Sequence, residues 1–288
     1  MMRSCTWQTL QDNDMMNGKI TVFNFSSVYE EESFYQGDKS SCFCGGGKEA
    51  LLLDMKDIPG TNCMCDDIAV AEIKERIAVN CCANNEGLNV EKETDSAALR
   101  DFLHGIHFID SGNYHYMSYI ILSMVKEPFS LVVFDHHPDM QPPKFGDILS
   151  CGGWVLKVLQ DNPNVRDVHI IGADKKLISD LPKEDRARVS FYTLDDIKTG
   201  LPKTEYPVYL SVDKDVVKRE ELITNWDQGE MNADDLLGSI RELASDPERK
   251  LIGIDICGEC APDQEGIDVG AAIAGNDEFN QKVLEILN

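Results

Sequence analysis

Four titratable residues, Asp135, His136, His137 and Asp139, stand within five positions directly after the apolar run at residues 131–134. This stretch contains no lysine or arginine. Carboxylates packed this closely repel one another, and burying them beside imidazoles is costly unless a cation neutralises them. We therefore interpret the stretch as a set of metal ligands. The alternative is an ordinary polar turn at the end of a strand.

The spacing of these residues indicates which of them act together. Asp135, His137 and Asp139 occupy every second position, and alternate residues of an extended chain point to the same side. His136 would then face away. Residues 131–134 are bulky and mostly β-branched or aromatic, as expected of a strand buried on both faces of a parallel sheet. The carboxyl ends of such strands are where α/β folds place their sites.

A second hydrophobic run, at residues 206–212, also ends in two carboxylates, Asp213 and Asp215. The ends of parallel strands emerge at one edge of a sheet, so these carboxylates could meet those that follow residue 134. The alternative is a solvated turn. A third group lies before both runs, where a glycine turn at residues 110–114 places His115 near the start of a helix. His115 is either a further ligand or an incidental residue of a helix cap.

Together these groups contain four carboxylates and two imidazoles: Asp135, Asp139, Asp213, Asp215, His115 and His137. Two divalent ions would balance the four negative charges. The set is rich in oxygen and lacks thiolate, which favours Mn²⁺ in octahedral coordination over tetrahedral zinc. Two such ions roughly 3.5–4 Å apart would share carboxylates and activate water as a nucleophile.

Apolar runs and amphipathic stretches alternate from residue 106 to the end, which predicts an α/β fold with a mainly parallel sheet. The predicted strands are residues 20–25, 106–109, 131–134, 168–171, 189–192, 208–212 and 251–256. The predicted helices are residues 66–77, with Ile68, Ile73 and Ile77 on one face, 116–125, 153–159, 232–244, capped by Asn232, and 276–287, capped by Asn276.

The chain has 288 residues, enough for one large α/β domain or two smaller ones. It shows no repeat or linker, so a single domain over residues 1–288 is preferred, with residues 1–66 as a divergent edge elaboration. The net charge of −24 argues against nucleic acid or anionic membrane as a partner. We found no membrane span or signal peptide and expect a cytoplasmic protein.

Ten cysteines in a chain of this length are too dilute for a disulfide scaffold and are expected to be reduced thiols. Three closely spaced groups are Cys42 and Cys44, Cys63 and Cys65, and Cys257 and Cys260. The first two groups could give four thiolates to zinc, although their spacing is shorter than usual, and the alternative is unpaired thiols in a loop. The third has redox C-x-x-C spacing, but an acidic loop follows it instead of a helix.

Three stretches resemble the signatures of the ureohydrolases, the family of arginase, agmatinase and formimidoylglutamase. They read Gly112-Asn-Tyr-His115, Asp135-His-His-Pro-Asp139 and Ser211-Val-Asp-Lys-Asp215, where the family has G-G-D-H, D-A-H-x-D and S-x-D-x-D. The resemblance covers residues 106–288 in order and spacing. It implies an arginase-like fold, two Mn²⁺ per chain, a small cationic guanidino or formimino substrate, and a homo-oligomer, either a trimer or a hexamer.

The resemblance also assigns roles to residues. His115 and Asp139 would hold one ion, and His137 and Asp215 would hold the other. Both ions would share the carboxylates of Asp135 and Asp213. In catalysis Asp139 would orient the attacking water. Cys151 falls where arginases carry a histidine proton shuttle. The late D-x-x-E of the family is one residue longer here, which makes Glu259 a candidate partner for the guanidinium group.

Two further positions depart from the family pattern: Tyr114 replaces an aspartate and His136 replaces an alanine. The sequence thus predicts a dinuclear manganese hydrolase of a linear guanidino or amidino C–N bond. The alternatives are a ureohydrolase-like protein that binds metal or a small ligand with little or no turnover, and a metal-dependent amide hydrolase of the deacetylase type.

Overall fold

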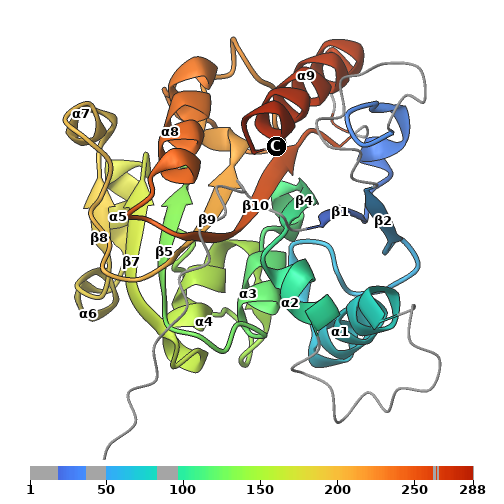
Figure 1. Cartoon of the computed structure of the whole chain (residues 1–288), viewed down its shortest axis with the longest axis horizontal. Helices are drawn as coiled ribbons and strands as arrows, with labels where there is room; N and C mark the ends of the chain where they lie inside the picture. The colour runs from blue at the N-terminus through green and yellow to red at the C-terminus, as the bar shows by residue number, and fades with distance from the viewer. Residues whose placement is uncertain (1–18, 37–49, 83–96, 262–263, 265, 288) are drawn as a thin grey trace, which may run out of the picture.

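The computed structural model describes residues 19–36, 50–82, 97–261, 264 and 266–287. An eight-stranded sheet forms the middle layer of this single domain (Figure 1). Its order is β2-β1-β4-β10-β9-β5-β7-β8, and all neighbours are parallel. The strands are β1 Ile20–Asn24, β2 Leu51–Asp54, β4 Ile106–Ser111, β5 Phe129–Phe134, β7 Val165–Ile171, β8 Ser190–Tyr192, β9 Val208–Asp213 and β10 Leu251–Glu259. The predicted α/β fold is confirmed.

The central strands are buried on both faces, which explains their continuous apolar runs. In β5, Leu131 and Val133 join one hydrophobic core, while Val132 and Phe134 join the core on the other face. Strand β5 pairs with β9 in parallel from Ser130 to Phe134. The two strands expected to deliver carboxylates are therefore direct neighbours, as the sequence predicts.

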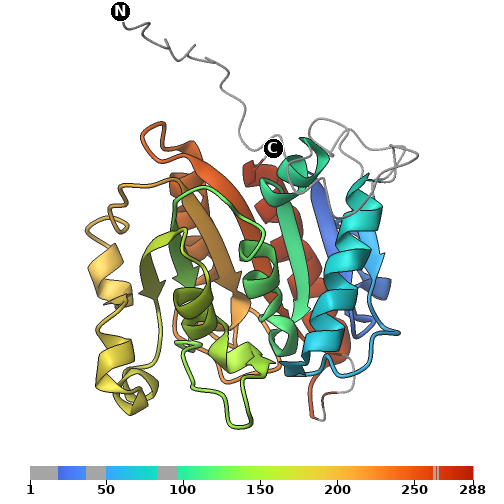
Figure 2. The same cartoon turned by 90° about the horizontal axis from the view of Figure 1, so that it is seen from below.

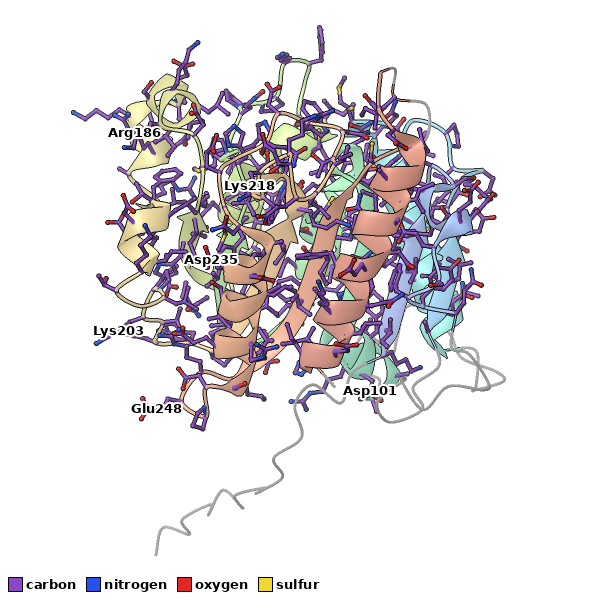
Figure 3. All side chains as sticks on the ribbon, turned by 90° about the horizontal axis from the view of Figure 1, so that it is seen from above. Asp101, Arg186, Lys203, Lys218, Asp235 and Glu248 are labelled. Atoms are coloured by element: carbon purple, nitrogen blue, oxygen red, sulfur yellow. The ribbon has the colours of Figure 1, made fainter. Side chains whose placement is uncertain are left out.

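Helices cover both faces of the sheet, and none in the described part of the chain is long and apolar enough to cross a membrane. One face carries α1 Asp67–Cys82, α2 Ala97–Leu103, α3 Met117–Leu122 and α4 Trp154–Asp161 (Figure 2). The other carries α8 Ala233–Ser245 and α9 Val269–Leu287, which lie in front in Figure 3. Near β7 and β8 lie α5 Lys175–Asp180, α6 Lys183–Arg186 and α7 Leu194–Ile197.

Short elements lie at the carboxyl end of the sheet. The 3₁₀ turns among the described residues are η1 Val28–Glu31, η2 Gly112–Tyr114, η3 Cys151–Gly153 and η4 Lys214–Val216. A small antiparallel pair joins β3 Met64–Cys65 to β6 Leu149–Ser150. Lys218 follows η4 and Glu248 precedes β10. The two residues lie towards opposite ends of the molecule in Figure 3.

The N-terminal part is not merely an elaboration beside the sheet. Strand β1 pairs with β4, and β2 pairs with β1 and forms the edge of the main sheet. Val22 and Phe23 of β1 are fully buried, on opposite faces. Residues 20–24 and 51–54 therefore belong to the same domain core as the rest of the sheet.

The predicted apolar face of α1 is wrong at one residue. Ile73 and Ile77 are buried and share their face with Ala69, at four-residue spacing. Ile68 is 79% exposed, because a separation of five residues turns it about 140° around the helix from Ile73.

The predicted start of the last helix is also wrong. Helix α9 begins at Val269, and the Asp268 carboxylate accepts a hydrogen bond from the Ala271 amide, as an N-cap does. Asn276 lies inside the helix, where it is buried and donates to the carbonyl of Ile223. Helix α8 starts directly after Asn232, as predicted, although the Asn232 side chain accepts no capping hydrogen bond.

Candidate metal centre

Adjacent strands of the sheet bring the predicted ligands to one place. His115 follows β4 through the turn η2, Asp213 is the last residue of β9, and Asp135 directly follows β5. Strands β4, β10, β9 and β5 are consecutive neighbours, so their carboxyl ends form one continuous edge. All three side chains are buried at this edge.

A hydrogen-bond chain fixes the His115 ring. Its Nε2 lies 3.0 Å from Ser211 Oγ, and that hydroxyl donates to Asp255 at 2.6 Å. Since the hydroxyl proton goes to Asp255, Ser211 has only acceptor capacity left for the imidazole. The proton of a neutral His115 ring therefore sits on Nε2, and Nδ1 presents its lone pair to the site.

The His115 Nδ1 atom lies among three carboxylate oxygens: Asp135 Oδ2 at 3.3 Å, Asp139 Oδ2 at 3.1 Å and Asp213 Oδ2 at 3.4 Å. Within the described residues neither Nδ1 nor Asp135 Oδ2 has a hydrogen-bond partner. Buried polar atoms are normally satisfied, and electron-rich atoms that converge without hydrogen bonds need a cation between them. This donor set therefore fits a metal ion.

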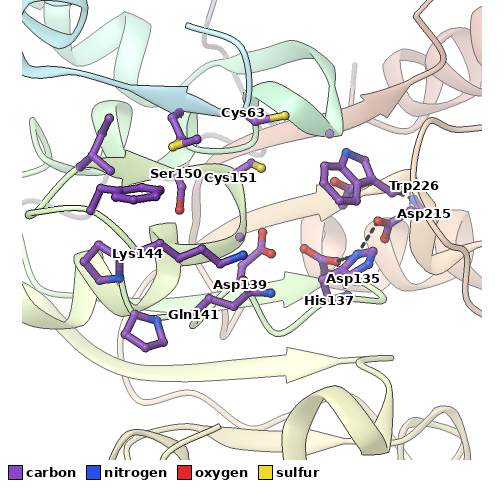
Figure 4. Close-up of a pocket in the computed structure, with 18 residues that line it drawn as sticks. Cys63, Asp135, His137, Asp139, Gln141, Lys144, Ser150, Cys151, Asp215 and Trp226 are labelled. Atoms are coloured by element: carbon purple, nitrogen blue, oxygen red, sulfur yellow. Dashed lines mark hydrogen bonds and ion pairs between the residues drawn. The ribbon is translucent and has the colours of Figure 1, made fainter. Parts of the chain in front are cut away.

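A second group forms around His137. Its Nδ1 lies 2.8 Å from Asp215 Oδ2 and 3.6 Å from Asp135 Oδ1. Asp135 therefore directs one oxygen towards His137 and the other towards His115 (Figure 4 shows the His137 side). Two groups of donor atoms, each within 4.8 Å, share this carboxylate: His115 with Asp135 and Asp139, and Asp135 with His137 and Asp215.

The electrostatics of the cluster agree with a cation-binding role. Burial and the neighbouring carboxylates raise the pKa of Asp213 to about 8 and that of Asp215 to about 6. Burial lowers the pKa of His137, but the neighbouring carboxylates of Asp135 and Asp215 outweigh it and raise this pKa to about 12. Burial opposes the charged form of His115 in the same way, yet Asp135 and its neighbours raise the pKa well above its usual value. Protons and metal ions thus compete for these atoms.

Asp139 reaches the cluster through a turn rather than an extended strand. Its backbone has φ of 48°, a left-handed conformation that aspartate tolerates better than most residues. The Trp154 indole N–H donates to Asp139 Oδ2 at 2.7 Å, and Trp154 is fully buried at the start of α4. Helix α4 thereby holds the carboxylate towards His115.

A cavity of about 360 Å³ opens beside the cluster. Its floor contains the carboxylates of Asp135, Asp139, Asp213 and Asp215. Its walls are largely apolar and include Met64, Phe145, Ile148 and Trp226, together with Gln141, Lys144, Ser150 and Cys151. In Figure 4 the Lys144 side chain extends across the cavity towards Asp139. A small molecule could thus place one end on the acidic floor.

Glu259 lies elsewhere, contrary to its expected role as a guanidinium partner. It does not line the cavity; it is buried and forms an ion pair with Lys214. Gly258 has φ of 100°, which breaks the alternation of β10. Cys257 consequently packs in the core on one face, whereas Glu259 meets Asn280 of α9, on the other face.

Other departures from the family pattern are placed as follows. Cys151 lines the cavity, as its alignment with a proton shuttle suggests. His136 does not line it, and its backbone amide donates to Asp215 at 3.0 Å. Tyr114 is buried and stacks on Phe25 of the N-terminal part.

No candidate metal group in the described residues contains Cys63 or Cys65, and Cys42 and Cys44 lie outside those residues. Cys257 joins such a group as a single thiol, beside His115 and Asp213. Cys65 is buried, whereas Cys63 is partly exposed at the cavity. Cys257 lies in the strand β10 instead of opening a helix, and its thiol donates to the Ser111 carbonyl at 3.3 Å. Burial raises the pKa of the Cys257 thiol well above its ordinary value, so its spacing does not make it a redox motif.

The sequence did not single out Trp226 and Lys144 as residues of a site, and it did not place Cys63 at the cavity. Trp226 comes from the loop after η4 and donates to Asn113 Oδ1 at 3.0 Å. A Cβ atom on Gly112 would lie 2.7 Å from the Trp226 ring, so the glycine is needed for this close packing. Nothing local in the sequence signals these positions, because loops far apart in the chain bring them together.

The fold is that of the arginase-like ureohydrolases. Formimidoylglutamase from Bacillus subtilis superposes with a TM-score of 0.60 at 17% identity, over 96% of this chain and 89% of that chain. Arginase from Bacillus cereus gives 0.59 at 13% identity, over 92% and 98%. A T. brucei arginase-like protein, in a mutant form bound with Mn²⁺, gives 0.55 at 16% identity, over 96% and 92%. The predicted resemblance is confirmed for the fold.

At the level of sequence, no family model matches the chain. An uncharacterized protein from Thermotoga maritima is 36% identical over 158 residues. The match covers 55% of this chain and 59% of that protein, so it spans less than two thirds of the length of its relative.

Proposed function

We propose that the protein is a dinuclear manganese-dependent hydrolase of a linear guanidino or amidino C–N bond. The observation that carries the proposal is the Asp135 carboxylate, whose two oxygens face two different imidazoles, 3.3 Å from His115 and 3.6 Å from His137. A single ion would need only one of these groups. Two ions that share Asp135 would use both, and the arginase-like fold supports this pattern.

The residues of the chain would divide the work as follows. His115 and Asp139 would hold one ion, His137 and Asp215 the other, and Asp135 and Asp213 both. Bound ions of this kind lower the pKa of water and polarise the carbon to be attacked. Asp139, held by the Trp154 indole, would fix the orientation of the attacking water.

Hydrolysis adds the oxygen of water to the amidino carbon, breaks the bond from carbon to the leaving nitrogen, and gives that nitrogen a proton. Cys151 is the nearest counterpart of a histidine shuttle, but the neighbouring Cys63 thiol and burial raise its pKa above the ordinary thiol value. It is therefore a weak acid at neutral pH. A substrate whose leaving group needs little protonation fits this site better than arginine.

The cavity favours a substrate with two charged ends. A cationic guanidino or formimino group suits the carboxylate floor, and Phe145 and Trp226 suit an aliphatic chain. Lys144 adds a positive charge to the lining, which favours a substrate that also carries a carboxylate over one that is otherwise apolar or cationic. The net charge of −24 also favours a small cation over nucleic acid or a membrane surface.

A second candidate is a protein that binds metal and a small ligand with little turnover. The position of Glu259 favours it, because this carboxylate is engaged by Lys214 and leaves no glutamate in the described cavity wall. Turnover separates the two candidates. Purified protein should first be analysed for metal, then loaded with Mn²⁺ and assayed for urea, ammonia and formamide over guanidino and formimino compounds.

The matched control in this assay is Asp135→Asn, which keeps the shape of the residue and removes its charge. We expect product release by the wild type from at least one carboxylate-bearing compound and none by the variant. Two bound Mn²⁺ without any product would favour the second candidate, and the absence of metal binding would reject both.

A further inference from the structure

Two cysteines in the wall of the cavity face each other one position beyond the end of the small β3–β6 ladder. Met64 pairs with Ser150 and Cys65 with Leu149, so the next position of the register sets Cys63 opposite Cys151. The backbone agrees, because the Cys151 amide donates to the Cys63 carbonyl at 2.9 Å. Residues from distant parts of the chain thus form a cross-strand pair.

The two thiols lie close enough to interact. The neighbouring Cys151 thiol lowers the pKa of Cys63 to about 7. Opposed residues of antiparallel strands have Cα atoms about 4.5–5.5 Å apart, which lies within the range of disulfides. Cys63 also has φ of 60°, so its backbone departs from regular strand geometry at this position.

The pair can be reached by small molecules. Cys63 and Cys151 both line the cavity, and both sulfur atoms are drawn in Figure 4. The other cysteines whose side chains the structure describes, Cys65, Cys257 and Cys260, are buried and do not line it. A solute that enters the cavity therefore meets these two thiols before any other described thiol.

We propose that Cys63 and Cys151 form a peroxide-oxidised dithiol that closes to a disulfide across the cavity wall. The Cys63 sulfur attacks a peroxide oxygen, which forms an S–O bond, breaks the O–O bond and releases water or an alcohol. The Cys151 sulfur then attacks Cys63, which forms the S–S bond, breaks the S–O bond and releases water. The two thiols lose two electrons and two protons, and the peroxide is reduced.

The crosslink would act on the candidate metal centre through helix α4. Cys151 begins the turn η3, which leads directly into Trp154, the residue that donates to Asp139. The Asp139 carbonyl also accepts from the Val155 amide at 3.0 Å. Tying Cys151 to β3 restrains this segment, so we expect oxidation to change ligand binding or turnover reversibly without releasing metal.

The test is a crosslink measurement on the full chain, made with and without Mn²⁺. The protein is treated with one equivalent of hydrogen peroxide, free thiols are alkylated, and peptides are mapped by mass spectrometry. We expect a disulfide-linked peptide pair that contains Cys63 and Cys151, and its loss on reduction with dithiothreitol. Cys63→Ser and Cys151→Ser should each abolish the linked pair, whereas the matched control Cys65→Ala should retain it.

Alkylation of both Cys63 and Cys151 after peroxide treatment of the wild type would overturn the proposal. So would a crosslink that joins Cys63 or Cys151 to a different cysteine. Because the readout is a covalent bond, it does not depend on turnover: a crosslink in a protein that hydrolyses nothing supports the dithiol and leaves the proposed hydrolase to fail separately.

Discussion

Lys214 and Glu259 form a buried ion pair directly behind the candidate metal centre. Lys214 stands between the predicted ligands Asp213 and Asp215, and Glu259 ends the adjacent strand β10. Asn280 of α9 donates to the same Glu259 oxygen at 2.8 Å. The pair therefore joins the ligand-bearing turn to the neighbouring strand and to the last helix.

Removing one partner of this pair should destabilise the fold. In Lys214→Met the Glu259 charge stays buried without its cation, and such changes cost about 3–5 kcal/mol. We expect a lower midpoint in chemical denaturation and weaker retention of Mn²⁺. Lys214→Met combined with Glu259→Gln should recover part of the loss, because the charge left without a partner is gone.

The matched control is Lys218→Met, since Lys218 forms an ion pair with Glu221 in which both side chains are partly exposed. Exposed pairs contribute little, so this variant should unfold like the wild type. Equal midpoints for Lys214→Met and Lys218→Met would contradict the structural role assigned to the buried pair.

The buried Glu32 carboxyl should make the stability of the folded protein depend on pH. Burial and the nearby carboxylate of Glu259 raise the pKa of Glu32 to about 10, from 4.5. The folded protein therefore keeps a proton that the unfolded chain loses, and stability decreases as the pH rises from about 4.5 towards about 10. Glu32→Gln imitates the protonated acid and should remove this slope.

Thermal unfolding of the wild type and Glu32→Gln at about pH 5 and about pH 9 measures this effect. We expect similar midpoints at the lower pH and a higher midpoint for the variant at the higher pH. A variant that is less stable than the wild type at both values would show that Glu32 is ionised in the folded state.

Lys144 should select among substrates. If it contacts a carboxylate of the substrate, Lys144→Met should raise KM for carboxylate-bearing compounds by roughly threefold, as expected for a partly exposed ion pair. KM for decarboxylated analogues should not rise. Lys203→Met is a suitable control, because Lys203 lies at the end of the molecule away from the cavity (Figure 3). An equal increase for both substrate classes would rule out charge recognition by Lys144.

Cys151 should limit proton delivery. A histidine in its place could protonate a leaving amine, and general acid catalysis contributes roughly 10²–10⁴-fold. We expect Cys151→His to gain urea release from arginine or agmatine, and the wild type to show little. Vigorous arginase turnover by the wild type would mean that the shuttle is another residue.

Local sequence patterns predicted the elements that carry the ligands. His115, Asp135 and Asp213 each stand at or just after the end of a strand, and a parallel sheet gathers such strand ends at one edge whatever the loops do. The geometry between the ligands could not be predicted in this way. Asp139 depends on a left-handed turn and on the Trp154 indole, and neither follows from the alternation of residues.

The residues that were misplaced depend on contacts far apart in the sequence. Glu259 was expected to face the substrate, but Gly258 reverses its direction and Lys214 holds it behind the site. Asn276 resembled a helix cap, yet it lies inside α9 because Ile223 offers it a buried carbonyl. Propensity and spacing describe the chain locally, whereas these positions are decided by their tertiary partners.

Metal stoichiometry tests the central claim most directly. Metal-free protein is titrated with Mn²⁺ by calorimetry, and wild type, Asp135→Asn and His137→Ala are compared. We predict close to two ions per wild-type chain, weakened binding at both sites in Asp135→Asn, and loss of mainly one site in His137→Ala. Unchanged stoichiometry and affinity in Asp135→Asn would contradict a dinuclear centre that shares this carboxylate.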